Sequence, residues 1–520
     1  MPRRTTDDTA RERIATDLDT TFLVEAGAGS GKTRSLVTRM VSLITSGRTT
    51  VDRIAAVTFT RKAAAELRER FQEALEKTAS QESIEAERAR TALGHLGEAA
   101  LGTTHSFCAR LLRERPVEAG LDPEFRELEE ADADRLLDLS WPEFLEKERT
   151  EESHVLADLT RLGVAPTQMV GLYKRLSQFR DVTPECRDLP IPDLDAARKA
   201  LEGFLNRLAK AVPADEPADG WDKLQAAYRF AQWRRRVFTL EDPADLIAVL
   251  ERFEKAAVVQ KRWTDAGAAR ALHQRELPAF QADYVTPALR AWREYLYPFC
   301  IRFASRAVRY AEAQRKEAGL LDFGDLLLRA RDLLRDNAPV RLAFADRYRY
   351  LLVDEFQDTD PVQAEILFYL AGEPPTPTAD WRQWRLRPGA LFVVGDPRQS
   401  IYRFRRADID TYNFVKERVA AGGGIVLTLS ANFRSVDGIG RFVDMAFRGV
   451  FPETANTFQA AFVPLETDRP GPASHAGVVR LVLPADARLK DDIVDADATR
   501  VAAFVAWALA GNVQIEEELG

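Results

Sequence analysis

The segment AGAGSGKT, from Ala26 to Thr33, combines three glycines with a lysine and a threonine. Backbone N–H groups of such a loop, at the start of a helix, surround a phosphate; Lys32 offsets its charge and the Thr33 hydroxyl binds Mg²⁺. Ala26 stands where this pattern usually has its first glycine. The alternative is a glycine turn with an incidental Lys-Thr pair. A β-rich stretch before the loop and a helical pattern after it favour the phosphate-binding loop.

Two adjacent acids, Asp354 and Glu355, follow the apolar run at 350–353. One carboxylate is expected near the metal position at Thr33, and the next is placed to orient a water molecule. Taken alone, such acids are also typical of a solvated strand end. Beside a phosphate loop they favour phosphoryl transfer to water, so the predicted ligands are ATP and Mg²⁺.

A third chemical segment, GDPRQSIYRFRRAD at 395–408, places Gln399 where it could sense the terminal phosphate. It then alternates Tyr402 and Phe404 with arginines, including Arg405. Aromatic rings interleaved with arginines suit single-stranded nucleic acid, whose bases stack on the rings. The alternative is a core aromatic pair beneath a basic surface, and this segment alone does not decide between the two.

Short apolar strands are predicted to position these groups. They lie at 21–25, 54–59, 350–355, 390–396 and 425–430, and helical patterns follow several of them. This arrangement predicts a parallel sheet covered on both faces, with ligands beyond the carboxyl ends of its strands. The long stretch between 105 and 320 has helical periods and little strand pattern, which predicts an inserted helical domain.

The composition limits the class of protein. A formal net charge of −8 excludes a chain that coats nucleic acid with its whole surface, so any such contact must be local. We find no apolar run long enough for a bilayer crossing and no secretory signal, and we expect no membrane partner. Cys108, Cys186 and Cys300 form neither a disulfide framework nor a zinc pattern, which favours a reducing cytoplasm.

Ordered motifs then resemble a known family. AGAGSGKT, TFTRKAAAELRER (58–70), GTTHSF (102–107), LLDFGDLL (320–327), VDEFQDTD (353–360), VGDPRQSIYRFR (394–405) and LSANFRS (429–435) follow the order of superfamily 1 DNA helicases of the UvrD/Rep type. Within that superfamily they look most like the AddA/RecB helicase subunits of double-strand-break repair. The insertion and the last eighty or so residues carry almost none of the resemblance.

The resemblance implies an α/β fold of the RecA-like P-loop NTPase type, a parallel sheet with a large helical insertion and a partial second RecA-like domain. The expected divisions are a first motor domain (1–105 and 320–407), a helical domain (106–319) and part of a second motor domain (408–520). ATP would lie between the motor domains, with single-stranded DNA across them.

Site roles carry over by position. Lys32, Glu355, Gln399 and Arg434 are the expected catalytic residues, with Arg434 as an arginine finger from the second motor domain. Thr33 and Asp354 would hold the metal. The nucleotide would contact Ala26, Gly27, Ala28, Gly29, Ser30, Gly31, Lys32, Thr33 and Arg34, with Phe433 stacking near adenine. DNA would contact Phe59, Thr60, His105, Tyr402, Phe404 and Arg405.

Two departures from the family pattern matter. The segment ARERIATDLD (10–19) lacks the glutamine that usually reads adenine, which puts base selectivity in question. Late motor motifs do not follow LSANFRS, so we expect an N-terminal portion of a longer polypeptide, or a split or truncated product, that unwinds DNA poorly alone. The expected partners are DNA ends or junctions and either an AddB/RecC-like subunit or the missing C-terminal half.

Three functions remain open from the sequence. The first is an ATP-dependent helicase that moves 3′ to 5′ on single-stranded DNA in repair and recombination. The second is a truncated DNA-binding or regulatory module that binds ATP and DNA with little turnover. The third is a P-loop enzyme acting on a small molecule.

Overall fold

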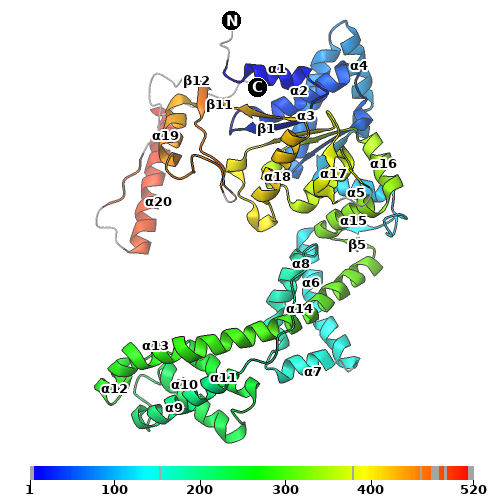
Figure 1. Cartoon of the computed structure of the whole chain (residues 1–520). Coiled ribbons are helices and arrows are strands. Elements are labelled where there is room, and N and C mark those ends of the chain that lie inside the picture. The colour runs from blue at the N-terminus through cyan, green and yellow to red at the C-terminus, as the bar shows by residue number, and fades with distance from the viewer. Residues whose placement is uncertain are drawn as a thin grey trace. The chain divides into compact units, whose positions relative to one another are not determined.

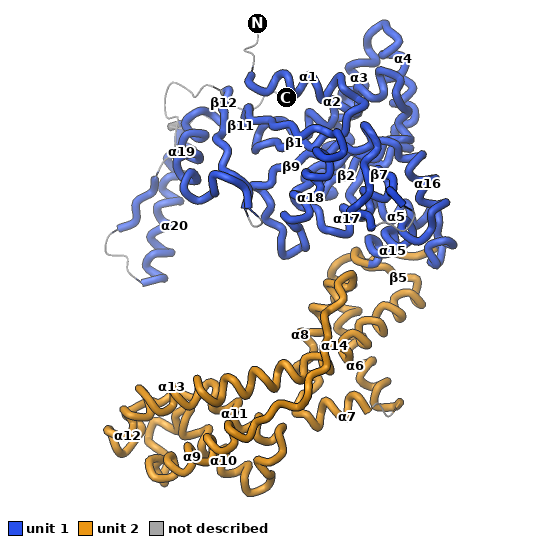
Figure 2. The backbone as a smooth tube through the Cα atoms, viewed as in Figure 1, with its two compact units in different colours: residues 1–123, 325–520 blue, residues 124–324 orange. Residues whose placement is uncertain are grey.

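The computed structural model describes residues 5–151, 154–376, 380–456, 459–469, 480–484 and 489–512. The chain divides into two compact units, shown in blue and orange in Figure 2. Unit 1 comprises residues 1–123 and 325–520, and unit 2 comprises residues 124–324. Parts of the expected second motor domain, at 457–458, 470–479, 485–488 and 513–520, lie outside the described residues.

Unit 1 is built on a sheet of six parallel strands in the order β10-β1-β9-β6-β2-β3. These strands are β1 (Phe22–Ala26), β2 (Ile54–Thr58), β3 (Ala100–Thr103), β6 (Tyr350–Val353), β9 (Leu391–Gly395) and β10 (Ile425–Leu429). The predicted parallel sheet is therefore confirmed. Because all six strands run the same way, the segments that leave their carboxyl ends share one edge of the sheet.

Helices cover both faces of this sheet (Figure 1). One face carries α1 (Asp8–Thr16), α2 (Lys32–Thr45), α3 (Arg61–Ala79) and α4 (Ile84–Gly94). The other carries α5 (Thr104–Glu114), α17 (Pro361–Ala371) and α18 (Ile409–Ala421), with α15 (Phe323–Asp336) and α16 (Ala338–Arg347) completing this part of the chain. Alternate strand residues such as Phe22, Val24 and Phe392 pack with Met40 and Phe71 in one core. Coverage of both faces explains why the strands read as continuous apolar runs.

The strand β10 corrects an expected boundary. The motif order places residues from 408 onward in a second motor domain, but β10 pairs with β1 along its whole length. Its residues Ile425 to Leu429 therefore form the edge of the first sheet, and α18 packs against β1 and β10. The strand predicted at 425–430 is present, whereas its partner cannot be deduced from periodicity.

After β10, the chain forms a separate two-stranded parallel pair of β11 (Ala431–Val436) and β12 (Glu466–Arg469). The helix α19 (Asp437–Phe447) packs on both strands, and α20 (Lys490–Trp507) follows later. The sequence predicts a helix from Ser435, and it begins two residues later because 431–436 is extended. A further antiparallel pair joins β7 (Gly372–Glu373) to β8 (Arg385–Leu386).

Unit 2 is helical apart from the short pair β4 (Arg126–Glu127) and β5 (Leu320–Leu321). Its helices are α6 (Glu130–Thr150), α7 (His154–Arg161), α8 (Pro166–Gln178), α9 (Asp195–Ala211), α10 (Lys223–Val237), α11 (Pro243–Glu254), α12 (Ala266–Ala271), α13 (Leu277–Phe280) and α14 (Thr286–Glu317). Two cores hold them, one around Phe204 and Phe253 and the other around Trp141 and Phe303. Compared with the expected insertion at 106–319, the compact unit runs from 124 to 324, because α5 packs on β2 and β3 in unit 1.

Arg39 fastens α1 to the sheet from inside the core. Its side chain, only 1% exposed, contacts the faces of Phe22 and Phe392. Its guanidinium donates to backbone carbonyls after α1, namely those of Ile14 (3.1 Å), Asp17 (2.9 Å), Leu18 (3.4 Å) and Thr20 (2.9 Å). One side chain therefore satisfies several carbonyls between α1 and β1.

Replacing Arg39 with methionine is expected to destabilise unit 1 by about 3 kcal/mol, because buried carbonyls would lose their donors. Thermal denaturation followed by circular dichroism should show a midpoint lowered by roughly 5 °C or more. The control is Arg48→Met, which removes an exposed ion pair with Asp19 (2.8 Å) and should cost less than about 1 kcal/mol. Equal effects of the two substitutions would contradict the anchoring role.

Candidate functional site

The glycine loop connects β1 to α2 at the carboxyl edge of the sheet. Gly29 (φ +69°) and Gly31 (φ +82°) adopt the left-handed conformation that favours glycine. A Cβ at Gly29 would also lie 2.6 Å from the Cβ of Arg434, which leaves no room for a side chain. Ser30 is buried, and its hydroxyl donates to the Gly27 carbonyl at 2.7 Å, which closes the turn. The loop backbone is thus held open at the start of α2, as a phosphate requires.

The acids after β6 lie beside this loop. Lys32 Nζ donates to Glu355 Oε2 at 2.6 Å, although the two residues are far apart in the sequence. The Thr33 hydroxyl hydrogen-bonds the Asp354 carboxylate, and the backbone N–H of Glu355 donates to Asp354 Oδ1 at 2.9 Å. Lys32, Thr33, Asp354 and Glu355 therefore meet at one place, as the sequence motifs require.

The electrostatics of this group fit a cation. Burial, and then the charge of Glu355, raises the pKa of Asp354 to about 6, against the opposing effect of Lys32. Asp358 lies nearby, and burial followed by the charge of Glu355 raises its pKa to about 6 as well. Carboxylate and hydroxyl oxygens at a phosphate loop are the ligands that Mg²⁺ prefers, so the residues present fit a magnesium-bound phosphate.

Gln357 joins the ends of β6 and β9, and the sequence analysis missed it. Its Oε1 accepts from the Asp396 backbone N–H at 2.8 Å, which directs its Nε2 toward Glu355 Oε2 at 2.7 Å. The side chain is buried. Gln399, by contrast, donates from Nε2 to Asp396 Oδ2 at 2.8 Å and makes no hydrogen bond with Glu355 among the described residues. Gln357 is thus the glutamine that contacts the carboxylate in this structure.

The segment after β10 packs directly on the loop. Asn432 Nδ2 donates to the Ala28 carbonyl at 2.6 Å, and the Phe433 N–H donates to the Gly29 carbonyl at 2.9 Å. Asn432 Oδ1 accepts from the N–H groups of Arg434 and Ser435, which fixes the start of the exposed pair Phe433 and Arg434. Asn432 is another residue that sequence reasoning missed, although an Asn whose side chain accepts from N–H groups two and three residues on is a recognised turn signal.

Three aromatic rings line up at the same edge. Phe59, which follows β2, lies 4.9 Å from Tyr402, and Tyr402 lies 5.7 Å from Phe404, as ring centroids. Phe404 is 78% exposed, so these rings form a surface rather than a core pair. Arg405 is exposed beside them. The expected base-stacking residues are thus brought together from two distant segments.

Other predicted residues occupy separate places. Thr60 caps α3, where its hydroxyl accepts from the Ala63 N–H at 3.1 Å. His105 lies in the first turn of α5, directly after β3. Arg34 lies on the first turn of α2 and is exposed. Their proximity to nucleotide or DNA stays a prediction.

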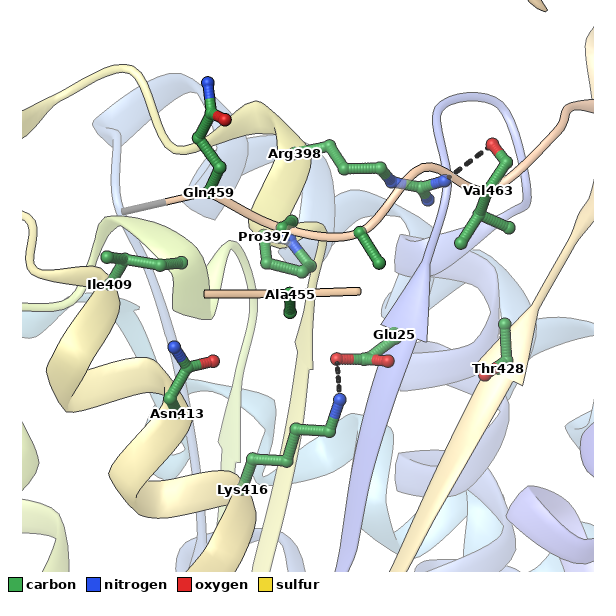
Figure 3. Close-up of a pocket in the computed structure, with 12 residues that line it drawn as sticks. Glu25, Pro397, Arg398, Ile409, Asn413, Lys416, Thr428, Ala455, Gln459 and Val463 are labelled. Atoms are coloured by element: carbon green, nitrogen blue, oxygen red, sulfur yellow. Dashed lines mark hydrogen bonds and ion pairs between the residues drawn. The ribbon is translucent and has the colours of Figure 1, made fainter. Parts of the chain in front are cut away.

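A small pocket lies at the carboxyl ends of β1 and β10, on the far side of the glycine loop from Glu355 (Figure 3). Within it, Lys416 Nζ on α18 donates to Glu25 at 2.6 Å, the same length as the Lys32–Glu355 pair. Arg398 bridges Asp396 (2.8 Å) and the Val463 carbonyl (3.2 Å). Of these two lysine pairs, that of Lys32 is the one formed by a residue of the glycine loop.

A parallel sheet, a glycine loop with left-handed glycines and converging Lys, Thr, Asp and Glu side chains define a P-loop nucleotide-binding protein. Comparison with known families gives the particular class. Residues 7–420 match the UvrD/REP helicase N-terminal domain, and the chain belongs to that family.

Curated relatives are named as ATP-dependent helicase/nuclease subunits of the AddA type. The protein of Bacillus velezensis is 28% identical over 95% of this chain and 43% of its own length. The protein of Listeria welshimeri is 28% identical over 80% of this chain, and that of Geobacillus kaustophilus 29% over 80%; each is matched over 37% of its own length. The chain thus spans less than half the length of these relatives. No helix within the described ranges combines the length and apolarity needed to cross a bilayer.

Proposed function

We propose that this chain is the N-terminal motor portion of an ATP-dependent DNA helicase that moves 3′ to 5′ on single-stranded DNA in repair and recombination. The carrying observation is the convergence of Lys32, Thr33, Asp354 and Glu355 at the glycine loop. Family membership and the helicase/nuclease names of the relatives support the assignment. The proposed site of action is the cytoplasm, on DNA ends or junctions.

Binding would begin at the loop. Its N–H groups and Lys32 would take the β- and γ-phosphates, which requires Lys32 to leave Glu355. Thr33 and Asp354 would hold Mg²⁺, which neutralises developing charge on the phosphates when bound. Glu355, released from Lys32 and still held by Gln357, would orient the attacking water and accept its proton.

Coupling to DNA would use residues already joined to the site. Gln399 shares Asp396 with the backbone contact of Gln357, which links the loop after β9 to the acids after β6. Arg434 would act as the arginine finger on the γ-phosphate, beside Gly29. The rings of Phe59, Tyr402 and Phe404 would hold successive bases.

We assign β11, β12, α19 and α20 to part of a second RecA-like domain. Exposed apolar residues on α19 and α20, among them Phe442, Met445 and Trp507, are consistent with faces that the rest of such a domain would cover. An AddB-like subunit or a C-terminal half would then complete the machine. We expect little strand separation by these 520 residues alone.

The test is ATP hydrolysis by the purified chain with and without a single-stranded oligodeoxythymidine. Stimulation by the oligonucleotide supports the motor. DNA binding with negligible hydrolysis would instead favour the truncated binding module. Hydrolysis indifferent to DNA would favour a small-molecule enzyme.

Phe404→Ala tests the stacking surface. Because one exposed ring is removed, the affinity for a labelled oligonucleotide should fall about tenfold in fluorescence anisotropy. Leu342→Ala on α16 is the control, since Leu342 is also highly exposed (67%) but lies on a helix outside the DNA-binding motifs. Unchanged affinity in Phe404→Ala would remove this residue from the DNA path.

A further inference from the structure

Arg11, on α1, lies at the nucleotide loop, where neither the sequence motifs nor the family assignment placed a residue of its type. Its Nη2 donates to the Ser30 carbonyl at 2.8 Å, and its Nη1 lies 3.6 Å from the position of a Cβ on Gly31. The helix α1 thus delivers a guanidinium to the side of the loop where α2 begins.

The orientation of this guanidinium is fixed. Asp7 Oδ1 accepts from Nε at 3.0 Å and Asp7 Oδ2 accepts from Nη2 at 2.8 Å. Asp7 is itself buried at 4% exposure, and its Oδ2 also accepts from the Ala431 N–H at 3.2 Å. The ion pair therefore ties α1 to the start of β11 and leaves Arg11 little freedom to turn.

Counting donors shows what Arg11 still offers. Of the five N–H groups of a guanidinium, Nε–H and both of those on Nη2 are used by Asp7 and Ser30. The two on Nη1 donate to no residue in the part of the chain that the structure describes. The side chain keeps 23% of its surface exposed, so a ligand can reach this edge.

Arg11 also occupies the place proposed for the base. Its guanidinium carbon lies 5.1 Å from the centroid of the Phe433 ring, which is 42% exposed and which we expect to stack near the base. A base that approaches Phe433 beside Ser30 and Gly31 therefore meets the free edge of Arg11. That edge carries donors alone, because arginine has no acceptor.

The two purines differ at the edge that such a group would read. Guanine presents two acceptors, O6 and N7, whereas adenine presents the N7 acceptor and the N6 amino donor. An amide side chain offers an acceptor to N6, and Arg11 cannot. We propose that Arg11 sets the base preference of this site, so that the chain accepts guanine nucleotides at least as well as adenine nucleotides. The inference rests on the proposed nucleotide site.

The experiment measures binding of mant-ATP and mant-GTP, labelled on the ribose, to the whole chain in the presence of Mg²⁺. For the unaltered protein, we expect GTP to bind as tightly as ATP within about threefold, or more tightly. Arg11→Gln should shift the ratio of the two affinities toward ATP by about tenfold, since an amide provides the missing acceptor. Arg11→Met should weaken GTP without improving ATP.

Arg13→Gln is the matched control. It lies on the same helix, where Arg13 pairs with Asp17 at 3.6 Å, and should leave the ratio unchanged. Circular dichroism melting of each variant shows whether α1 stays in place, and a variant that binds neither nucleotide is judged on Arg11→Met instead. The inference is wrong if the unaltered chain prefers ATP by about tenfold or more, or if Arg11→Gln leaves the ratio as it was. Absence of binding that depends on Lys32 would refute the nucleotide site itself, a separate result.

Discussion

Lys32→Met is expected to weaken binding of ATP about 100-fold and to lower hydrolysis at saturating ATP by a further factor of about 100 or more. A charged hydrogen bond to phosphate contributes roughly 3 kcal/mol, and the methionine side chain keeps the length but not the charge. The unliganded fold should change little. The Lys32–Glu355 pair leaves Glu355 33% exposed, so its carboxylate keeps solvent when the lysine is lost.

Lys416→Met is the control for this substitution. It breaks a lysine–glutamate hydrogen bond of equal length, 2.6 Å, to a residue of β1 (Figure 3). Titration with mant-ATP and a phosphate-release assay should show near-normal values for Lys416→Met. If both lysine variants lose nucleotide to the same extent, the effect comes from the stability of β1 and not from the phosphate site.

The sheet could be predicted because its strands are apolar on both faces. Runs such as 350–353 and 391–395 have no alternation, and only a strand buried between helices tolerates that pattern. The strand β3, with Leu101 and Gly102 partly exposed at the sheet edge, lacks that pattern, so the sequence marks it only as part of a motif. An edge strand buries less, so it leaves a weaker record in the sequence.

Strand partners were harder to predict than strands. The segment 425–429 was expected in a second domain, yet it pairs with β1. Pairing depends on where the chain returns after α18, and no local pattern encodes that. The insertion boundary has the same origin, since α5 could pack on either unit as far as its own amphipathic pattern shows.

For the candidate site, motifs predicted residue identity and the structure supplied the contacts between them. Lys32 and Glu355 meet because β1 and β6 end at one sheet edge, separated only by β9. Gln357, Asn432 and Arg11 were not predicted. Each acts through a hydrogen bond to a backbone group of a distant segment, and such a bond leaves no spacing pattern. The catalytic roles of all these residues stay predictions.

Glu355→Gln is expected to lower ATP hydrolysis about 1,000-fold while nucleotide affinity stays within about threefold. The reason lies in the position of the carboxylate. Glu355 adopts a left-handed backbone (φ 51°, ψ 44°), a strained conformation for a residue other than glycine. It is held by its N–H to Asp354 and by the carbonyl that accepts from Asp358 N–H at 2.9 Å. Glutamine keeps that backbone and the length of the side chain, so only the ability to accept a proton is lost.

Single-turnover hydrolysis separates this effect from binding, because it reports chemistry after ATP is bound. The control, Glu373→Gln, changes an exposed glutamate on β7 in the same way and should leave the rate unaltered. Gln357→Leu gives an intermediate test. It removes the donor to Glu355 Oε2 (2.7 Å) without touching the phosphate loop, so it should slow hydrolysis less than Glu355→Gln does and leave affinity unchanged. Hydrolysis by Glu355→Gln at more than about a tenth of the normal rate would mean that another group accepts the proton. Asp358, whose pKa is raised to about 6 beside Glu355, would then be the first candidate.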